Sequence, residues 1–211
     1  MSASPPAWRD WVRRLQQVAD TGMTYARDPY DVHRSQAVRA VAAELAAHHA
    51  GGDPEVLASQ LAADGAGHPT PKVDVRAAAV RDGRVLLVRE RVDGGWTLPG
   101  GYADIGEPPA AAAARELREE AGWAGTAVKL IALHDRDRRN PPAHVHHIYK
   151  LIFLCELTGD TPAGEPDHEV TGVGFFGPGD LPPLSTGRTT RAQLELAFAH
   201  AADPALPAEF D

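Results

Sequence analysis

The chain has 211 residues, of which 43% are hydrophobic and 24% are charged, and this composition is typical of a folded globular protein. Its formal net charge of −8 argues against general nucleic-acid binding, because proteins with that function usually carry a basic face that neutralises phosphates. The charge does not exclude a nucleotide substrate that arrives with metal ions.

The sequence also bears on where the protein works. The opening segment MSASPPAWRD lacks the basic and apolar regions of a secretory signal. No apolar run approaches the roughly 20 residues that span a bilayer. The single cysteine, Cys155, lies in the apolar run IYKLIFLCEL, so we interpret it as a core thiol. The sequence therefore predicts a cytoplasmic protein that does not enter a membrane.

Helical patterns occupy the first part of the chain. A first helix, ending near Gly22, has apolar residues at the three-and-four spacing of an amphipathic helix: Trp8, Trp11, Val12, Leu15 and Val18. A second helix carries Val38, Val41 and Leu45. A third is predicted over residues 53–61, with Asp53 as its N-cap. These helices are too few to bury both of their faces. We therefore expect them to pack on the rest of the chain or on a second subunit.

Residues 64–71, rich in glycine and proline, read as a linker. We therefore divide the chain into a helical domain, residues 1–66, and a second domain, residues 67–211. The second domain begins with a predicted hairpin, in which an Asp-Gly turn joins two apolar strands. Further strands are expected at about 126–134, 146–157 and 170–176, and a last helix at about 188–200. Alternating strands and helices indicate a mixed α/β domain.

The segment RELREEAGW, residues 115–123, places Glu116, Glu119 and Glu120 on one helix face. Like charges at this spacing cost about 0.2–0.5 kcal/mol per pair. Gly122 is typical of the position just after a helix, so the acids also oppose the negative end of the helix dipole, at about 0.3–1 kcal/mol each. Local physics disfavours the arrangement, and we infer that another interaction offsets its cost.

Gly101 and Glu107 stand upstream of this helix. A glycine lets the backbone approach a ligand, and its carbonyl is a hard oxygen donor like the glutamate carboxylates. Ligands that are all oxygen suit Mg²⁺ or Mn²⁺ rather than zinc. Ions held in this way usually serve the hydrolysis of a phosphate ester or anhydride. The segment RELREE alone would fit an ordinary surface helix, but the fixed distances to Gly101 and Glu107 favour a metal site.

Residues 101–123 resemble the Nudix box: glycine, five residues, glutamate, seven residues, then Arg-Glu-apolar-any-Glu-Glu-any-Gly-apolar, with every fixed position matched. The resemblance implies the Nudix fold, a mixed β-sheet sandwiched between helices. It implies metal binding by Gly101, Glu116, Glu119 and Glu120. It also implies catalytic roles for Glu119, Glu120 and Arg115, with Arg115 orienting the helix carboxylates and Glu107 supporting the substrate site.

The resemblance extends beyond the box. The stretch WRDWVRRLQQVADTGMTYARDPYDVHR is similar to the small helical domain of the CDP-choline pyrophosphatase and ADP-ribose pyrophosphatase-like group. Resemblance to this group implies a homodimer formed through the helical domain. It also implies hydrolysis of a nucleoside diphosphate linked to another moiety, such as CDP-choline or ADP-ribose, to a nucleoside monophosphate and a phosphorylated product.

Further site residues are predicted outside the box. Glu169, in the segment GEPDHEV, best matches the extra catalytic acid of the family, although an exposed loop acid is the alternative. Arg76 and Arg89, on the first two strands of the sheet, are placed to reach a diphosphate bidentately, with a structural ion pair as the alternative.

Other polar and aromatic groups have an ordinary explanation. The basic loop 136–139 can face a second phosphate or solvent, and Tyr25 and Tyr30 can stack a base or pack at an interface. Five histidines show no regular zinc-ligand spacing: His134, His144, His146, His147 and His168.

Two other functions remain open. A Nudix-like nucleotide sensor without turnover would not need all three helix glutamates, so the intact box weighs against it. An enzyme acting on RNA ends would need a basic channel, which the net charge disfavours.

Overall fold

The computed structural model describes residues 7–50, 53, 56, 70–140 and 146–211. Among these, the residues before Lys72, together with His146 and His147, form one compact unit, and the rest form a second. Most of the predicted third helix lies outside the described residues, as does the predicted boundary between residues 66 and 67. Both therefore remain predictions.

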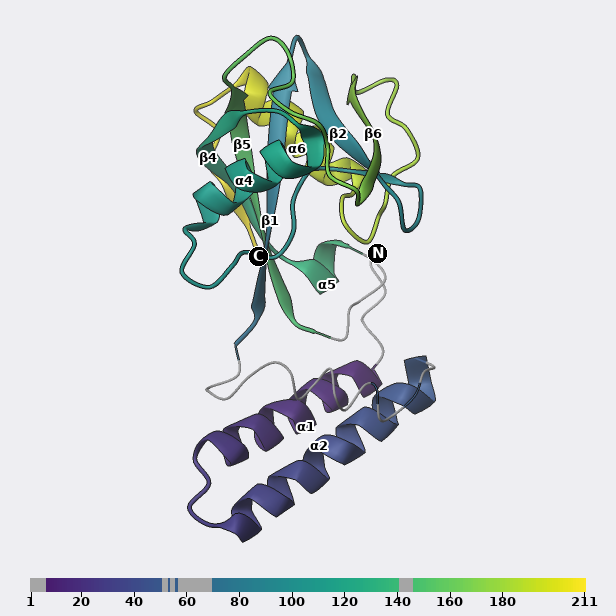
Figure 1. Cartoon of the computed structure of the whole chain (residues 1–211), viewed down its shortest axis with the longest axis vertical. Coiled ribbons are helices and arrows are strands. Elements are labelled where there is room, and N and C mark those ends of the chain that lie inside the picture. Colours follow the sequence, from purple (N-terminus) through teal and green to yellow (C-terminus); the bar gives the residue numbers. More distant parts are fainter. Residues whose placement is uncertain (1–6, 51–52, 54–55, 57–69, 141–145) are drawn as a thin grey trace. The chain divides into compact units, whose positions relative to one another are not determined.

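The first unit contains two helices, α1 (Ala7–Thr24) and α2 (Pro29–Ala50), which pack side by side (Figure 1). As predicted, α1 buries Val12, which packs with alanines of α2. The helix ends at Thr24, near Gly22 as predicted. Trp11 and Val18 belong to the predicted apolar stripe, yet they are 53% and 62% exposed. Part of the predicted stripe is therefore exposed among the described residues of this unit.

The second unit is built on a mixed sheet. Within the described residues its strands are β1 (Lys72–Arg81), β2 (Arg84–Glu90), β3 (Trp96–Thr97), β4 (Gly125–Asp135), β5 (Ile148–Leu157), β6 (Val170–Phe176) and β7 (Glu209–Phe210). The order is β3-β2-β1-β5-β4-β7, and β6 pairs with the other side of β2. β1 and β5 run parallel, and so do β4 and β7, while the other pairs are antiparallel.

The predicted hairpin is confirmed: β1 and β2 meet at a turn in which Asp82 and Gly83 both have positive φ, 51° and 70°. Such a turn matches the twist of the two strands it joins. Beyond this end of the hairpin β1 and β2 no longer pair, and the segment 99–103 pairs with the edge of β1 instead. The loop of the predicted site is thereby fixed to the sheet.

Helices cover the two faces of the sheet, as predicted for the Nudix fold (Figure 1). α4 (Pro109–Ala121) packs on one face through Leu117, against Val75 and Val88. α6 (Arg191–Ala202) packs on the other face through Leu194. A short helix, α5 (Arg136–Arg139), follows β4 in the segment that we had interpreted as a loop.

Cys155 is buried, and burial raises the pKa of its thiol to about 12, in agreement with a core thiol. None of the helices in the described part of the chain has both the length and the apolarity that crossing a membrane requires.

The end of α4 gives a first prediction. Gly122 has φ +71°, and a Cβ there would lie 2.3 Å from the carbonyl oxygen of Gly164. Alanine at Gly122 should therefore lower the free energy of unfolding by about 1–2 kcal/mol, measured by urea denaturation. Gly164→Ala is the matched control, because a Cβ there meets nothing within 4 Å. Equal stability of the two variants would contradict this explanation of Gly122.

Candidate active site

The three glutamates occupy the last turns of α4. Gly122 adopts the left-handed conformation at the helix end, and its N–H donates to the carbonyl of Arg118, as expected for the residue after a helix. The carboxylates differ in exposure: the side chain of Glu119 is 46% exposed and that of Glu116 13%, while Glu120 is buried. The three carboxylates on this helix face thus range from partly exposed to buried.

Arg115 binds three of the predicted carboxylates at once. Its Nε and Nη2 donate to the two oxygens of Glu107, each at 3.1 Å. Its Nη1 donates to Glu116 at 3.0 Å and to Glu119 at 2.8 Å. The guanidinium therefore fixes the start of the loop-helix segment to its acidic end.

Two glycines bring the backbone close to the carboxylates of Glu116 and Glu120. The N–H of Gly100 donates to Oε2 of Glu120 at 2.8 Å. The carbonyl of Gly101 accepts the N–H of Val75 at 2.8 Å, which leaves one lone pair for another partner. A Cβ on Gly101 would lie 3.1 Å from Oε1 of Glu116. The structure therefore brings Gly101, Glu116 and Glu120 together.

Burial dominates the electrostatics of these acids. The pKa of Glu120 is raised to about 8, first because burial disfavours the charged carboxylate and then because Glu116 and Glu90 are near, while Arg76 and the Gly100 N–H oppose the rise. Burial also raises the pKa of Glu116, although Arg115 lowers it. Conversely, the hydrogen bond from Arg115 lowers the pKa of Glu107.

Arg76 lies close to these acids but is fully engaged with the protein. It is 4% exposed, and its Nε and Nη2 donate to the two oxygens of Asp74 at 2.8 and 2.9 Å. Its Nη1 donates to the carbonyl of Leu98 at 3.1 Å. The guanidinium therefore holds the site loop in place.

Arg89 lies elsewhere. Its side chain is exposed and its Nε donates to the carbonyl of Gly94 at 3.0 Å, in the turn after β2. Its neighbour Glu90, which the sequence analysis missed, is buried and close enough to Glu120 to raise its pKa. Strand alternation offered a signal, since Leu86 and Val88 face α4 and Glu90 follows at the same spacing.

The loop that carries Glu169 is hydrogen-bonded to the end of α4. The N–H of Asp167 donates to the carbonyl of Glu119 at 2.9 Å, and that of Ala163 to the carbonyl of Gly122 at 2.7 Å. Glu169 itself is exposed; burial raises the pKa of Glu90, and the nearby charge of Glu169 adds to this rise. The structure thus brings the acidic loop that carries Asp167 and Glu169 to the same end of α4 as the helix glutamates.

The donor set fits a hard divalent cation, because it consists of carboxylates and a backbone carbonyl that crowd one another. In the described residues no three acidic, histidine or cysteine side chains already converge as a metal cage. Arg115 lies between Glu116 and Glu119 in this arrangement. A bound ion would therefore compete with the guanidinium for the same oxygens.

Comparisons with known proteins agree with this geometry. Residues 70–197 match the NUDIX domain, and residues 6–61 match a family described as a UDP-X-like, N-terminal oligomerisation domain. The chain is 35% identical to the putative ADP-ribose pyrophosphatase YjhB of Bacillus subtilis (strain 168), over 97% of each protein. It is 29% identical to the ADP-ribose pyrophosphatase of Methanocaldococcus jannaschii, over 54% of this chain and 67% of that protein.

Solved structures give the same picture. A UDP-X diphosphatase aligns with a TM-score of 0.61 and 29% identity, covering 97% of this chain and 98% of its own. An ADP-ribose pyrophosphatase from Streptococcus suis 89-1591 also aligns with a TM-score of 0.61, at 36% identity, covering 67% of this chain and all of its own.

The raised pKa of Glu120 predicts a pH effect. The folded protein, with a pKa of about 8, binds the proton more tightly than the unfolded chain, whose value is near 4.5. The resulting stabilisation is present below the unfolded pKa and is lost as the pH rises through the folded one. Without divalent metal, wild-type stability should therefore fall by a few kcal/mol, relative to Glu120→Gln, between about pH 5 and pH 8.

Chemical denaturation in EDTA across this pH range measures the difference. Glu195→Gln, at a side chain that is 61% exposed, is the control and should follow the wild type. Parallel pH profiles for the wild type and Glu120→Gln would show that Glu120 does not titrate in this way.

Proposed function

The chain belongs to the Nudix family and is a Nudix hydrolase, and from this premise we propose that it cleaves the pyrophosphate bond of a nucleoside diphosphate linked to another moiety. ADP-ribose and CDP-choline are the substrate types that we propose. The products are a nucleoside monophosphate and the phosphorylated second moiety. The observation that carries the proposal is the group of glutamates at the end of α4, held by Arg115 and by the Gly100 N–H.

We propose that the carbonyl of Gly101 and the carboxylates of Glu116, Glu119 and Glu120 hold Mg²⁺ or Mn²⁺. Such an ion neutralises phosphate charge and makes a bound water more acidic. The raised pKa values of Glu116 and Glu120 support this assignment, because burial disfavours their charged forms and the nearby arginines offset this only in part.

The proposed reaction is attack of a water oxygen on one phosphorus, with breakage of the bridging P–O bond and transfer of the water proton to a carboxylate. We assign the proton to the group formed by Glu119, Glu120 and Glu169.

The arginines and Glu107 support the reaction. Glu107 orients Arg115, which in turn orients the helix carboxylates. Arg76 is bonded to Asp74 and Leu98, so we propose that it contributes to the substrate site chiefly by positioning the glycine loop. Arg89, exposed on β2, stays a proposed substrate contact.

We further propose a homodimer formed through α1 and α2. The family matched by residues 6–61 is described as an oligomerisation domain. Trp11 and Val18 lie seven residues apart on α1, hence on one helix face, and both are more than half exposed. Burial of this apolar face by a second copy would remove it from water.

A substrate panel tests the activity. With Mg²⁺ or Mn²⁺, the wild type should convert ADP-ribose or CDP-choline to a nucleoside monophosphate, identified by mass spectrometry, and reaction in ¹⁸O-water should label one of the two products. Glu120→Gln should lower kcat by about 10²-fold or more while remaining folded, because it removes a carboxylate that is proposed to act on the reacting water. Glu195→Gln is the control. Nucleotide binding without cleavage across the panel would favour the alternative function, a nucleotide sensor without turnover.

Light scattering after size-exclusion chromatography tests the dimer. Trp11→Glu and Val18→Glu should each shift the protein from dimer toward monomer, because a charge in an apolar interface is costly. Ile105→Glu replaces an apolar side chain that is fully exposed in the other unit and should leave the dimer intact. A wild type that is monomeric at micromolar concentration would refute the assignment.

A further inference from the structure

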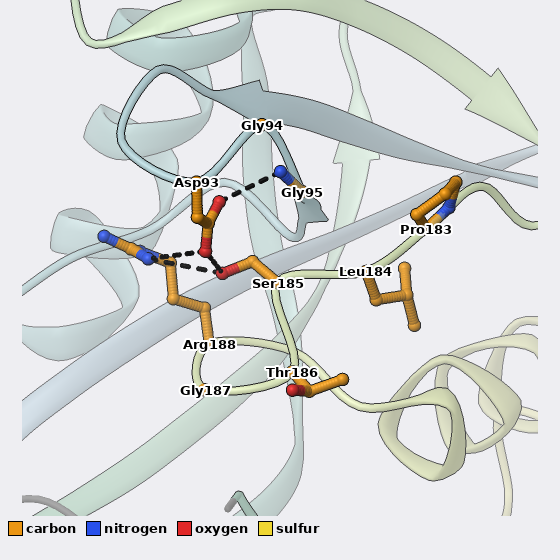
Figure 2. A pocket seen from close by; sticks show the side chains of 9 residues that line it. All are labelled: Asp93, Gly94, Gly95, Pro183, Leu184, Ser185, Thr186, Gly187 and Arg188. Carbon is orange, nitrogen blue, oxygen red and sulfur yellow. Dashed lines mark hydrogen bonds and ion pairs between the residues drawn. The ribbon is translucent and has the colours of Figure 1, made fainter. Parts of the chain in front are cut away.

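A pocket of about 410 Å³ lies between the turn after β2 and the segment leading into α6. It is lined by Asp93, Gly94, Gly95, Pro183, Leu184, Ser185, Thr186, Gly187 and Arg188 (Figure 2). This volume is within the range of about 300–1,000 Å³ that is usual for small-molecule sites. None of these residues has a role in the proposed hydrolysis.

Hydrogen bonds fix the polar side chains of the pocket (Figure 2). Asp93 accepts the N–H of Gly95 at 2.9 Å through one oxygen and the hydroxyl of Ser185 at 2.6 Å through the other. Nη1 of Arg188 donates to the hydroxyl oxygen of Ser185 at 3.2 Å. The N–H of Ser185 donates to the carbonyl of Trp96 at 2.9 Å. The pocket is therefore preformed, which lowers the entropic cost of binding.

Arg188 connects the pocket with the carboxylate site. Its Nε lies 3.1 Å from Oε1 of Glu90, and the N–H of Arg91, the residue after Glu90, donates to the carbonyl of Glu169 at 3.0 Å. The buried amine of Lys150 donates to the carbonyl of Arg188 and so holds the backbone of the segment. The pocket is therefore connected, through Arg188 and Glu90, with the loop that carries Glu169.

The side chains of the pocket discriminate among ligand charges. The hydroxyl of Ser185 is the main reason why the pKa of Asp93 is lowered, and the carboxylate is therefore ionised. Asp93 and Arg188 lie 3.5 Å apart with opposite charges, so together they give neither a phosphate nor a quaternary ammonium a net attraction. A neutral hydroxyl can use both side chains, because it can donate to Asp93 and accept from Arg188.

We propose that this pocket is the subsite for the moiety linked to the nucleoside diphosphate, and that it selects a neutral group with neighbouring hydroxyls, a sugar, over a cationic alcohol. Asp93 accepts hydrogen bonds from the sugar hydroxyls, and Arg188 donates one to them. The assignment rests on the proposed hydrolysis, and it narrows the substrates to sugar-linked nucleoside diphosphates.

Two ligands that share the adenine base test the proposed sugar subsite. They are ADP-ribose and the butyl ester of ADP, which lacks hydroxyls beyond the diphosphate. Binding is measured by calorimetry with Mg²⁺ in a Glu120→Gln background, so turnover is not required. Asp93→Ala should reduce the preference for ADP-ribose over the butyl ester, expressed as the ratio of their Kd values, by about tenfold or more. Asp203→Ala is the matched control, because Asp203 likewise accepts the N–H of the residue two positions on, Ala205 at 2.9 Å.

Thr186→Phe provides a second test in case loss of Asp93 disturbs the turn. Thr186 is an exposed lining residue, so phenylalanine should fill the pocket without disturbing the core, and Thr186→Val is its isosteric control. An unchanged preference in both Asp93→Ala and Thr186→Phe, or an equal loss for both ligands, would overturn the subsite. Absence of cleavage by the wild type would refute the hydrolysis alone, since the binding preference is measured independently.

Discussion

The hydrogen bond from the Gly100 N–H to Glu120 is the contact on which the site depends. It places a carboxylate that is only 7% exposed against the backbone beside β1, where an unpaired charge would be costly. The same loop is tied to β1 through the carbonyls of Pro99 and Gly101. Helix α4, the glycine loop and the first strand are thus fixed to one another. Only glycine permits this, because Gly100 has φ +148° and a Cβ would lie 2.0 Å from the carbonyl oxygen of Val75.

Two guanidiniums pair with acidic residues of the site and still leave it short of positive charge. Arg115 pairs with Glu107, Glu116 and Glu119, while Arg76 pairs with Asp74. Even with these partners, burial keeps the pKa values of Glu116 and Glu120 above their ordinary range. The cations of the protein therefore do not neutralise the acids in full. This shortage, rather than the acidity of the helix alone, is the physical argument for a bound cation.

The parts of the site that follow local periodicity could be predicted from the sequence, because each depends on neighbours in the chain. Gly122 ends α4, and Arg115 reaches Glu119 at the i, i+4 spacing. The role of Arg76 was harder to predict. The sequence placed Arg76 on a strand but did not show that its guanidinium pairs with Asp74, two residues earlier on the same face. The pairing can be recognised only in the folded structure, where both side chains are buried together.

Glu90 and Arg188 could not be paired from the sequence, because they are distant in the chain and meet only through the sheet. The pairing of β2 with β6 shifts register between Arg89 and Glu90, and such irregularities have no reliable sequence signal. Arg188 lies in the connection after β6, which is fixed in part by the buried Lys150. The predicted hairpin, α4 and α6 were correct, while the contacts between loops depended on tertiary packing.

Arg188 has a further physical consequence, since one guanidinium contacts acids that belong to different parts of the molecule. Its Nε pairs with Glu90, beside the helix glutamates, and its Nη1 lies 3.5 Å from Asp93 in the pocket wall. A ligand that engages Arg188 from the pocket changes the field at Glu90, and a change in the charge of Glu90 alters the affinity of the pocket by the same free energy. The sugar subsite and the carboxylates are therefore linked through a single side chain. Occupancy of the proposed subsite would then affect the acids that are proposed to act on the diphosphate, so selection of the substrate and its cleavage would depend on the same guanidinium.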